Sequence, residues 1–258
     1  MYYIGIDIGG TNIRSALINK TANITNLVKN SSSSEIVKDI INQIIKQIEF
    51  SKEKNIIIKG IGISIGGIVD KENGEIINVS NIGKWSSMKI KEKLIKELIE
   101  SQILDDSILQ NIIIDNDGNC AAHCEKYFGN AIGCNNFINI VLGTGVGIGV
   151  YVNNQIIQFS EFGYLVEHKC SGKFFDSIAE NRDKLILEGA EYLGEKIADL
   201  CNIVCPDKLI LNGPLLNITN NFKKEIQNAI YRHLIIKDLS LIFSNINNQG
   251  LLGSISLL

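Results

Sequence analysis

The chain has 258 residues, of which 45% are hydrophobic and 21% are charged, which suits one large domain or two small ones packed together. Its 25 basic and 28 acidic residues give a net charge of −3, whereas nucleic-acid-binding modules are usually strongly basic. Composition and charge therefore predict a folded protein with no nucleic-acid partner.

We expect no targeting or membrane segment in this chain. Residues 2–7 read directly as a strand, without the basic and then apolar stretch of a secretory signal. The most apolar stretch, 137–152, contains polar residues and glycines and is shorter than the ~20 residues of a membrane span. None of the six cysteines forms a Cys-x-x-Cys pair. We expect a soluble, cytoplasmic protein with no membrane partner.

Strands and helices alternate along the first half of the chain. Three strands are expected between residues 3 and 26, followed by a helix over 36–48, where isoleucine recurs every fourth residue. Continuous apolar runs predict buried strands at 56–65 and 110–114, and a helix at 90–98 lies between them. This half therefore has an α/β pattern.

The second half begins with the same succession of elements. A strand, a glycine–threonine turn, a second strand, a two-residue turn and a third strand follow one another, and such self-similarity indicates a structural repeat. The strands are expected at 137–142, 147–152, 155–157 and 208–211, and the helices at 185–204 and 220–234. The sequence thus predicts two similar βββαβα halves, divided near Asp117, with a ligand cleft between them.

The two glycine–threonine turns are candidate phosphate sites. Glycines let the backbone approach a ligand closely, and successive N–H groups in a turn can bind phosphate. The simpler interpretation, a plain hairpin turn, would be preferred for either turn alone, but a matched pair favours a polyphosphate held from both sides. Asp7 could hold Mg²⁺ through water. The predicted phosphate-binding residues are Gly9, Gly10, Thr11, Asn12, Gly143, Thr144 and Gly145.

Residues 115–119, Asp-Asn-Asp-Gly-Asn, lie where a buried strand passes into a helix. A carboxylate at such a junction can cap the helix N-terminus. The carboxyl end of a strand is also where open α/β sheets bind ligands. On that second interpretation, Asp117 accepts a proton from a substrate hydroxyl and Asn116 orients the alcohol.

Taken together, these motifs resemble the ROK group (repressor, open reading frame, kinase) of the actin-like ATPase superfamily. The resemblance spans essentially the whole chain, at residues 7–12, 62–67, 81–85, 115–119, 143–145, 209–213 and 250–253. It implies an α/β fold of the actin-like ATPase (ribonuclease H-like) type. The implied domains are 1–116, completed by a C-terminal helix at 249–258, and 117–248.

Within the group, residues 62–67 and 115–122 look most like N-acetylmannosamine kinases. The resemblance then implies ATP- and Mg²⁺-dependent phosphorylation of the sugar 6-hydroxyl, in sialic acid catabolism, by a homodimer. Asp117 would be the catalytic base, and Gly213 would lie near the adenine. The implied sugar-binding residues are Gly66, Gly67, Asn81, Asn116, Asp117, Glu161, Tyr164 and Asp176.

Two alternatives remain. The same residues would serve a glucokinase or another hexose or hexosamine kinase. A sugar-responsive regulator is less expected, since Asp7 lies too near the start for the DNA-binding helix-turn-helix that such relatives carry first.

The resemblance departs from its pattern after the second turn. The family usually has Glu-x-Gly-His followed by a cysteine-rich zinc loop. Here Glu161-Phe-Gly is followed by Tyr164, and the loop is reduced to residues 169–176 with one cysteine. Tetrahedral zinc cannot be assembled from these positions, so no zinc is expected. Asp176 would replace the last glutamate of the family loop, and Tyr164 together with Phe174 and Phe175 would hold the loop by packing.

Overall fold

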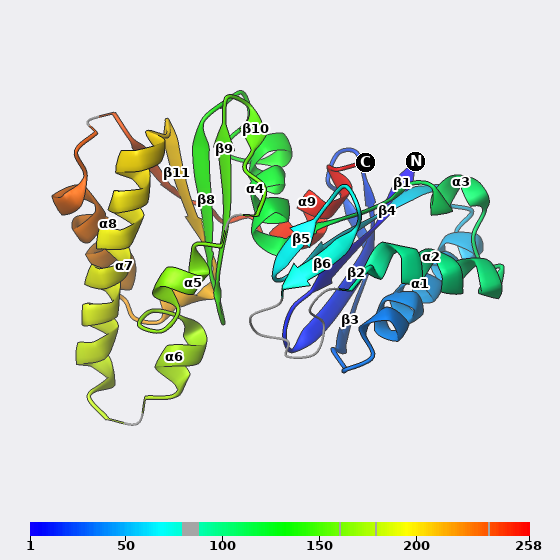
Figure 1. Ribbon diagram of the computed structural model, residues 1–258, viewed down its shortest axis with the longest axis horizontal. Helices are drawn as coiled ribbons and strands as arrows, with labels where there is room; N and C mark the ends of the chain where they lie inside the picture. The colour runs from blue at the N-terminus through cyan, green and yellow to red at the C-terminus, as the bar shows by residue number, and fades with distance from the viewer. Residues whose placement is uncertain (79–87, 160, 179, 237) are drawn as a thin grey trace. The chain divides into compact units, whose positions relative to one another are not determined.

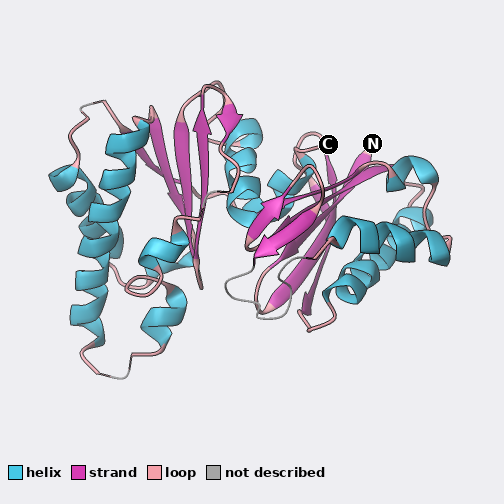
Figure 2. Cartoon of the chain, in the orientation of Figure 1, coloured by secondary structure: helices cyan, strands magenta, loops and turns pink. Residues whose placement is uncertain are grey.

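The computed structural model describes residues 1–78, 88–159, 161–178, 180–236 and 238–258. It divides into two compact units. Figure 1 colours the chain by residue number, and Figure 2 colours it by secondary structure. Unit 1 comprises residues 1–129 and 247–258, and unit 2 comprises residues 130–246.

Unit 1 is built on a five-stranded mixed sheet in the order β3-β2-β1-β4-β7. Its strands are β1 (Tyr2–Ile8), β2 (Asn12–Asn19), β3 (Ile24–Ser31), β4 (Ile58–Ile65) and β7 (Ile112–Asn116). The first three strands are antiparallel neighbours, whereas β4 runs parallel to both β1 and β7. The carboxyl ends of β1, β4 and β7 therefore lie at one edge of the sheet.

Helices cover both faces of this sheet. The isoleucines of β1 and β4 pack in one apolar core with α1 and α2, while α9 packs on the opposite face beside α4. Gly5 and Gly62 permit this approach, because a side chain at either would collide with the α9 backbone. The helices are α1 (Ile36–Glu53), α2 (Ile90–Ser101), α3 (Asp106–Leu109), α4 (Asp117–Phe128) and α9 (Gln249–Ile255).

Unit 2 repeats this strand order, as β10-β9-β8-β11-β12. Its strands are β8 (Phe137–Leu142), β9 (Val146–Val152), β10 (Gln155–Ile156), β11 (Lys208–Asn212) and β12 (Ser240–Phe243). Its helices are α5 (Gly163–Val166), α6 (Gly172–Asp176), α7 (Arg182–Val204) and α8 (Phe222–His233), with a 3₁₀ turn at Pro214–Asn217. Alternate residues of β8 and β9 form one core with α7 and α8 (Figure 1).

The predicted α/β class is confirmed, and the two sheets share one strand order. The division of the chain differs from the prediction, because α4 packs against α9 and so belongs to unit 1 rather than to the second half. The strand β12 and the hairpin of β5 (Ile68–Asp70) and β6 (Glu75–Asn78) were not predicted from the sequence. Strands of three or four residues are too short for periodicity to detect. Within the described residues, no helix is long and apolar enough to cross a membrane.

Candidate active site

The described site residues that were predicted in unit 1 gather at the carboxyl edge of its sheet. In the parallel ladders, Ile8 of β1 lies beside Ile65 of β4, which in turn lies beside Asn116 of β7. The turn after β1, the two glycines after β4 and the junction after β7 therefore start from neighbouring positions. This edge is where α/β sheets bind ligands.

Asp7 lies at this edge, one residue before the end of β1. Its Oδ1 accepts a hydrogen bond from Ser64 Oγ at 3.0 Å. Burial of the carboxyl raises the pKa of Asp7, and the Ser64 hydrogen bond and the positive charge of Arg14 partly oppose this shift. A side chain at Gly250 would collide with Oδ1, so α9 approaches the carboxylate through a glycine.

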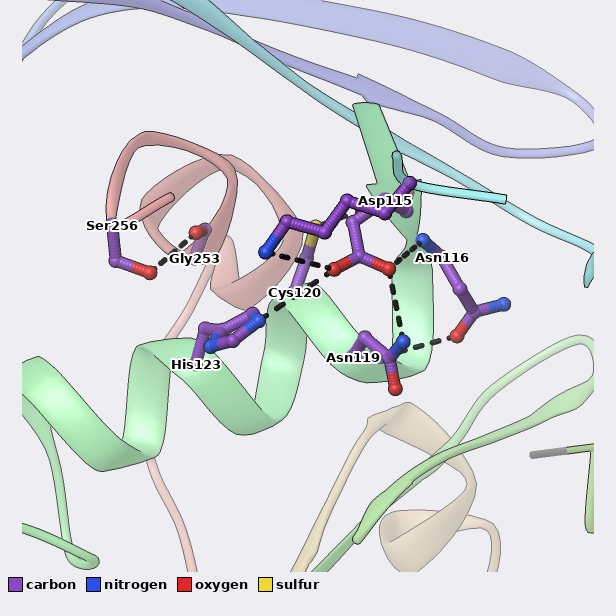
Figure 3. Close-up of polar contacts among 8 residues, drawn as sticks. Asp115, Asn116, Asn119, Cys120, His123, Gly253 and Ser256 are labelled. Atoms are coloured by element: carbon purple, nitrogen blue, oxygen red, sulfur yellow. Dashed lines mark hydrogen bonds and ion pairs between the residues drawn. The ribbon is translucent and has the colours of Figure 1, made fainter. Parts of the chain in front are cut away.

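The junction of β7 and α4 is capped by an amide. Asn116 Oδ1 accepts from the backbone N–H of Asn119 at 3.1 Å, so Asn116 fills the capping role that was considered for a carboxylate (Figure 3). Asn116 Nδ2 donates to the carbonyl of Gly67 at 2.7 Å. These bonds orient the amide and leave one N–H and one oxygen lone pair for a ligand.

Asp117 begins α4 and is partly exposed. Its Oδ1 accepts from the backbone N–H of Gly118 at 2.8 Å. A Cβ built on Gly66 would lie 3.6 Å from Asp117 Oδ2, so the missing side chain of Gly66 leaves space beside that oxygen. Gly67 has a φ of +102°, which an L residue rarely adopts. This arrangement leaves one carboxylate oxygen of Asp117 beside space that a substrate hydroxyl could use.

Each of the two predicted phosphate turns is closed by a hydrogen bond from its first residue, but the first turn is one residue longer than the second. The N–H of Gly9 donates across its turn to the carbonyl of Asn12 at 2.9 Å. The N–H of Gly143 donates to the carbonyl of Gly145, also at 2.9 Å. A side chain at Gly10 would meet no protein atom within 4 Å, so the first turn is open around that residue. The twin pattern in the sequence thus corresponds to two hairpin turns that differ in length by one residue.

The second turn is braced by the shortened loop of unit 2. The N–H of Gly172 donates to the carbonyl of Gly143 at 2.8 Å, and the N–H of Lys173 donates to that of Thr144 at 3.0 Å. Gly213 has a φ of +112°, and a side chain there would collide with the carbonyl of Leu142, the residue before the turn. The structure therefore brings Gly213 beside the turn at 143–145.

The remaining predicted sugar-binding residues lie in unit 2 or outside the described residues. Glu161 is partly buried, whereas Tyr164, on α5, is 81% exposed. Asp176, at the end of α6, forms an exposed ion pair with Arg182 at 3.6 Å. Asn81 lies outside the described residues, and its contribution stays a prediction.

Aromatic packing holds the shortened loop. Phe175 is fully buried, with ring centroids 5.4 Å from Phe174 and 6.1 Å from Phe222. Burial raises the pKa of Cys170 to about 12, so this residue stays a thiol at neutral pH. Among the described residues, no three His, Cys, Asp or Glu side chains are grouped so that they could hold a metal ion.

Several residues of the site were not identified from the sequence. Ser64 and Arg14 act on Asp7 from neighbouring strands, and Glu167 Oε1 accepts from the N–H of Val146, beside the second turn, at 2.7 Å. A lone serine at the end of an otherwise apolar strand was the available signal for Ser64. Asp115 was noted as part of its motif but was given no role.

Comparisons with known proteins place the chain among sugar-related proteins. The sequence model of the ROK family matches residues 3–163. A glucokinase of Halalkalibacterium halodurans is 25% identical over 88% of this chain and 84% of that protein. A beta-glucoside kinase of Listeria innocua is 27% identical over 94% and 81%, and a xylose repressor of Bacillus spizizenii is 26% identical over 90% and 70%.

Solved structures share the fold over the whole chain. A ROK family glucokinase from Streptomyces griseus, in complex with glucose and AMPPNP, superposes with a TM-score of 0.81 at 21% identity, covering 100% of this chain and 99% of that one. A proposed N-acetylmannosamine kinase from Listeria monocytogenes gives a TM-score of 0.80 at 19% identity, covering 99% and 97%. The chain belongs to the ROK family and has the actin-like ATPase fold of its kinases.

Proposed function

We propose that the chain is a sugar kinase that transfers the γ-phosphoryl group of ATP to the 6-hydroxyl of N-acetylmannosamine. The observation that carries this proposal is the position of Asp117, whose Oδ2 faces the space left by Gly66 at the carboxyl edge of the sheet. Membership of the ROK family and similarity to several kinases support the choice of reaction.

In the proposed reaction, Asp117 accepts the proton of the 6-hydroxyl as that oxygen bonds to the γ-phosphorus. The bond between the γ-phosphorus and the bridging oxygen breaks, and ADP leaves. Asn116 orients the sugar with the N–H that its bonds to Gly67 and Asn119 leave over. Catalysis of this kind depends mainly on positioning and on neutralising the phosphate charge.

The turns at 9–12 and 143–145 would bind the phosphates through backbone N–H groups and the hydroxyls of Thr11 and Thr144. A single carboxylate such as Asp7, completed by water and substrate phosphates, fits the oxygen ligands that Mg²⁺ prefers. The ion would supply positive charge to the transferred phosphoryl group. Arg14 keeps positive charge near the Asp7 carboxyl.

N-acetylmannosamine carries an axial 2-acetamido group that needs room in the pocket. Gly66 and Gly67 would provide that room, while Asn81, Glu161, Tyr164 and Asp176 would contact the ring hydroxyls. A kinase of glucose or a related hexose is the second candidate function, since two of the relatives are a glucokinase and a beta-glucoside kinase. An apolar pocket discriminates one small group by only ~1–3 kcal/mol, so activity on both sugars is expected.

The first experiment measures ADP release with Mg²⁺ across a panel of N-acetylmannosamine, N-acetylglucosamine, glucose and mannose. We expect the highest kcat/KM for N-acetylmannosamine. Asp117→Asn should keep its bond to the Gly118 N–H but lower kcat by ~10²–10⁴-fold, as expected for loss of a general base. Asp199→Asn, at an exposed position of α7, is the control. Near-native kcat in Asp117→Asn would refute the assignment of the base.

A second pair of variants tests the substrate and the nucleotide turn. Gly66→Ala places a methyl group in ordinary contact with Asp117, so the fold should persist while N-acetylmannosamine loses more kcat/KM than glucose. Gly10→Val meets open space in the fold and should raise the KM for ATP alone. Equal losses of kcat/KM for the two sugars in Gly66→Ala would refute the assignment of N-acetylmannosamine as substrate but not the assignment of kinase activity. An unchanged ATP KM would remove the phosphate role of Gly10.

A further inference from the structure

A carboxylate that the proposed mechanism does not use lies directly beneath the catalytic junction. Asp115, two residues before Asp117, is fully buried at the end of β7. Its Oδ1 accepts from the N–H of Asn116 at 2.7 Å and from Asn119 Nδ2 at 2.9 Å (Figure 3). Asp115 therefore bonds to residues on both sides of Asp117.

These bonds continue into a closed network. The N–H of Asn119 donates to Asn116 Oδ1, and Asn116 Nδ2 donates to the carbonyl of Gly67. Asp115 Oδ1 thus fixes both Asn119 and Asn116, and Asn116 fixes the glycine turn that faces Asp117. The direction in which the Asp117 carboxylate points depends on this network, because Asp117 is carried by the same turn of chain.

The other oxygen of Asp115 lies between two cationic or basic groups. Oδ2 is 3.6 Å from His123 Nε2 (Figure 3). The same oxygen is 3.8 Å from Lys71 Nζ. Both distances are longer than hydrogen bonds, and the Lys71 ammonium group attracts the carboxylate electrostatically. Lys71 belongs to the turn between β5 and β6, and its side chain is about one-third exposed, at 31%. Lys71 thereby links the hairpin that follows Gly67 to the junction.

A purely structural role explains this arrangement less well. Buried ion pairs contribute little to stability compared with apolar side chains of the same size, because both charges lose their hydration. The Asp115 carboxylate nevertheless lies where its Oδ1 can order the residues on either side of the proposed base, Asp117. Apolar packing at this position could not supply those two directed hydrogen bonds.

We propose that Asp115 is a positioning residue for the catalytic turn, holding Asn116 and Asn119 through Oδ1 while Lys71 holds Oδ2. The consequence for the reaction rests on the proposed function, in which Asp117 is the base. Asp115 does not touch the substrate and acts only through its neighbours.

The test uses the full chain and four variants. Asp115→Ala removes the network, whereas Asp115→Asn keeps an acceptor oxygen and removes the charge. Lys71→Met keeps the aliphatic stem without the ammonium group, and Lys71→Arg restores the charge. Lys38→Met, which removes the exposed ion pair with Glu35 on α1, is the matched control. Each variant is assayed below its own unfolding temperature.

We expect Asp115→Ala to lower kcat by about 10²-fold, the scale of a displacement of about 1 Å in a catalytic group, with the ATP KM within twofold of wild type. Asp115→Asn should lose less, Lys71→Met should lose about tenfold, and Lys71→Arg and Lys38→Met should stay within threefold. A folded Asp115→Ala or Lys71→Met with kcat within threefold of wild type would overturn the proposal. If Asp115→Ala does not fold, the kcat values of Lys71→Met, Lys71→Arg and Asp115→Asn test the proposal instead.

Amide hydrogen exchange provides a readout that does not depend on activity. The N–H groups of Asn116 and Asn119 should exchange at least about tenfold faster in Asp115→Ala and Lys71→Met, while the amides of α1 stay unchanged. Unchanged exchange at both residues would contradict the positioning role. If wild type phosphorylates no sugar, the proposed function fails, and the exchange rates still decide whether Asp115 orders the turn.

Discussion

The packing of Phe175 leads to a prediction about the stability of the shortened loop at residues 169–176. The ring is fully buried on α6 and contacts the rings of Phe174 and Phe222. It also lies against α7 at Gly189, where a side chain would collide with it. Replacing a buried phenylalanine by alanine typically costs ~3–5 kcal/mol. Phe175→Ala should cost an amount in the upper part of this range, because two ring–ring contacts disappear with the ring.

Phe175→Ala should also weaken the binding of ATP. Since Gly172 and Lys173 of α6 donate to the turn at 143–145, displacement of α6 should raise the KM for ATP more than that for the sugar. Urea unfolding followed by circular dichroism measures the stability, with and without a chelator. Tyr231→Ala, at a half-exposed position of α8, is the control and should change stability by less than about 1 kcal/mol.

Two results would refute this reasoning. One is a loss of less than about 1 kcal/mol in Phe175→Ala, which would mean that the aromatic packing does not hold the loop. The other is stoichiometric zinc in the purified protein together with destabilisation of wild type by the chelator. Either result would require another way of anchoring α6 to the turn.

Three further predictions follow from individual sites. Burial raises the pKa of Asp7 above its value in the unfolded chain, so part of the stability of the fold is lost as pH rises through the folded pKa and the carboxyl ionises. Asp7→Asn should therefore be more stable than wild type at pH 7. In urea titrations this difference in stability should shrink towards pH 3. Cys205 is exposed, whereas burial raises the pKa of Cys124 and Cys201 to about 12, so mass spectrometry after brief alkylation should find Cys205 labelled and those two only after unfolding. Gly213→Ala should destabilise unit 2 in thermal melts, because its φ is +112° and a Cβ would collide with Leu142; an unchanged melting temperature would contradict that packing.

Local patterns in the sequence were sufficient to predict most elements and the location of the junction. The isoleucines of α1, the apolar runs of β4 and β7 and the twin glycine turns are each determined by residues close together in the chain. Periodicity and turn chemistry act over such short distances, so one sequence was enough to predict them. The repeated order of elements likewise indicated two similar halves.

Only the tertiary structure decided which polar groups meet. Asp7 bonds to Ser64 because parallel pairing sets β1 and β4 in register, and Lys71 reaches Asp115 because the β5–β6 hairpin lies against β7. The same holds for α4, which the sequence assigned to the second half and which joins unit 1 by packing on α9. Such contacts depend on strand register and helix packing between distant segments, and no local pattern in this sequence encodes them.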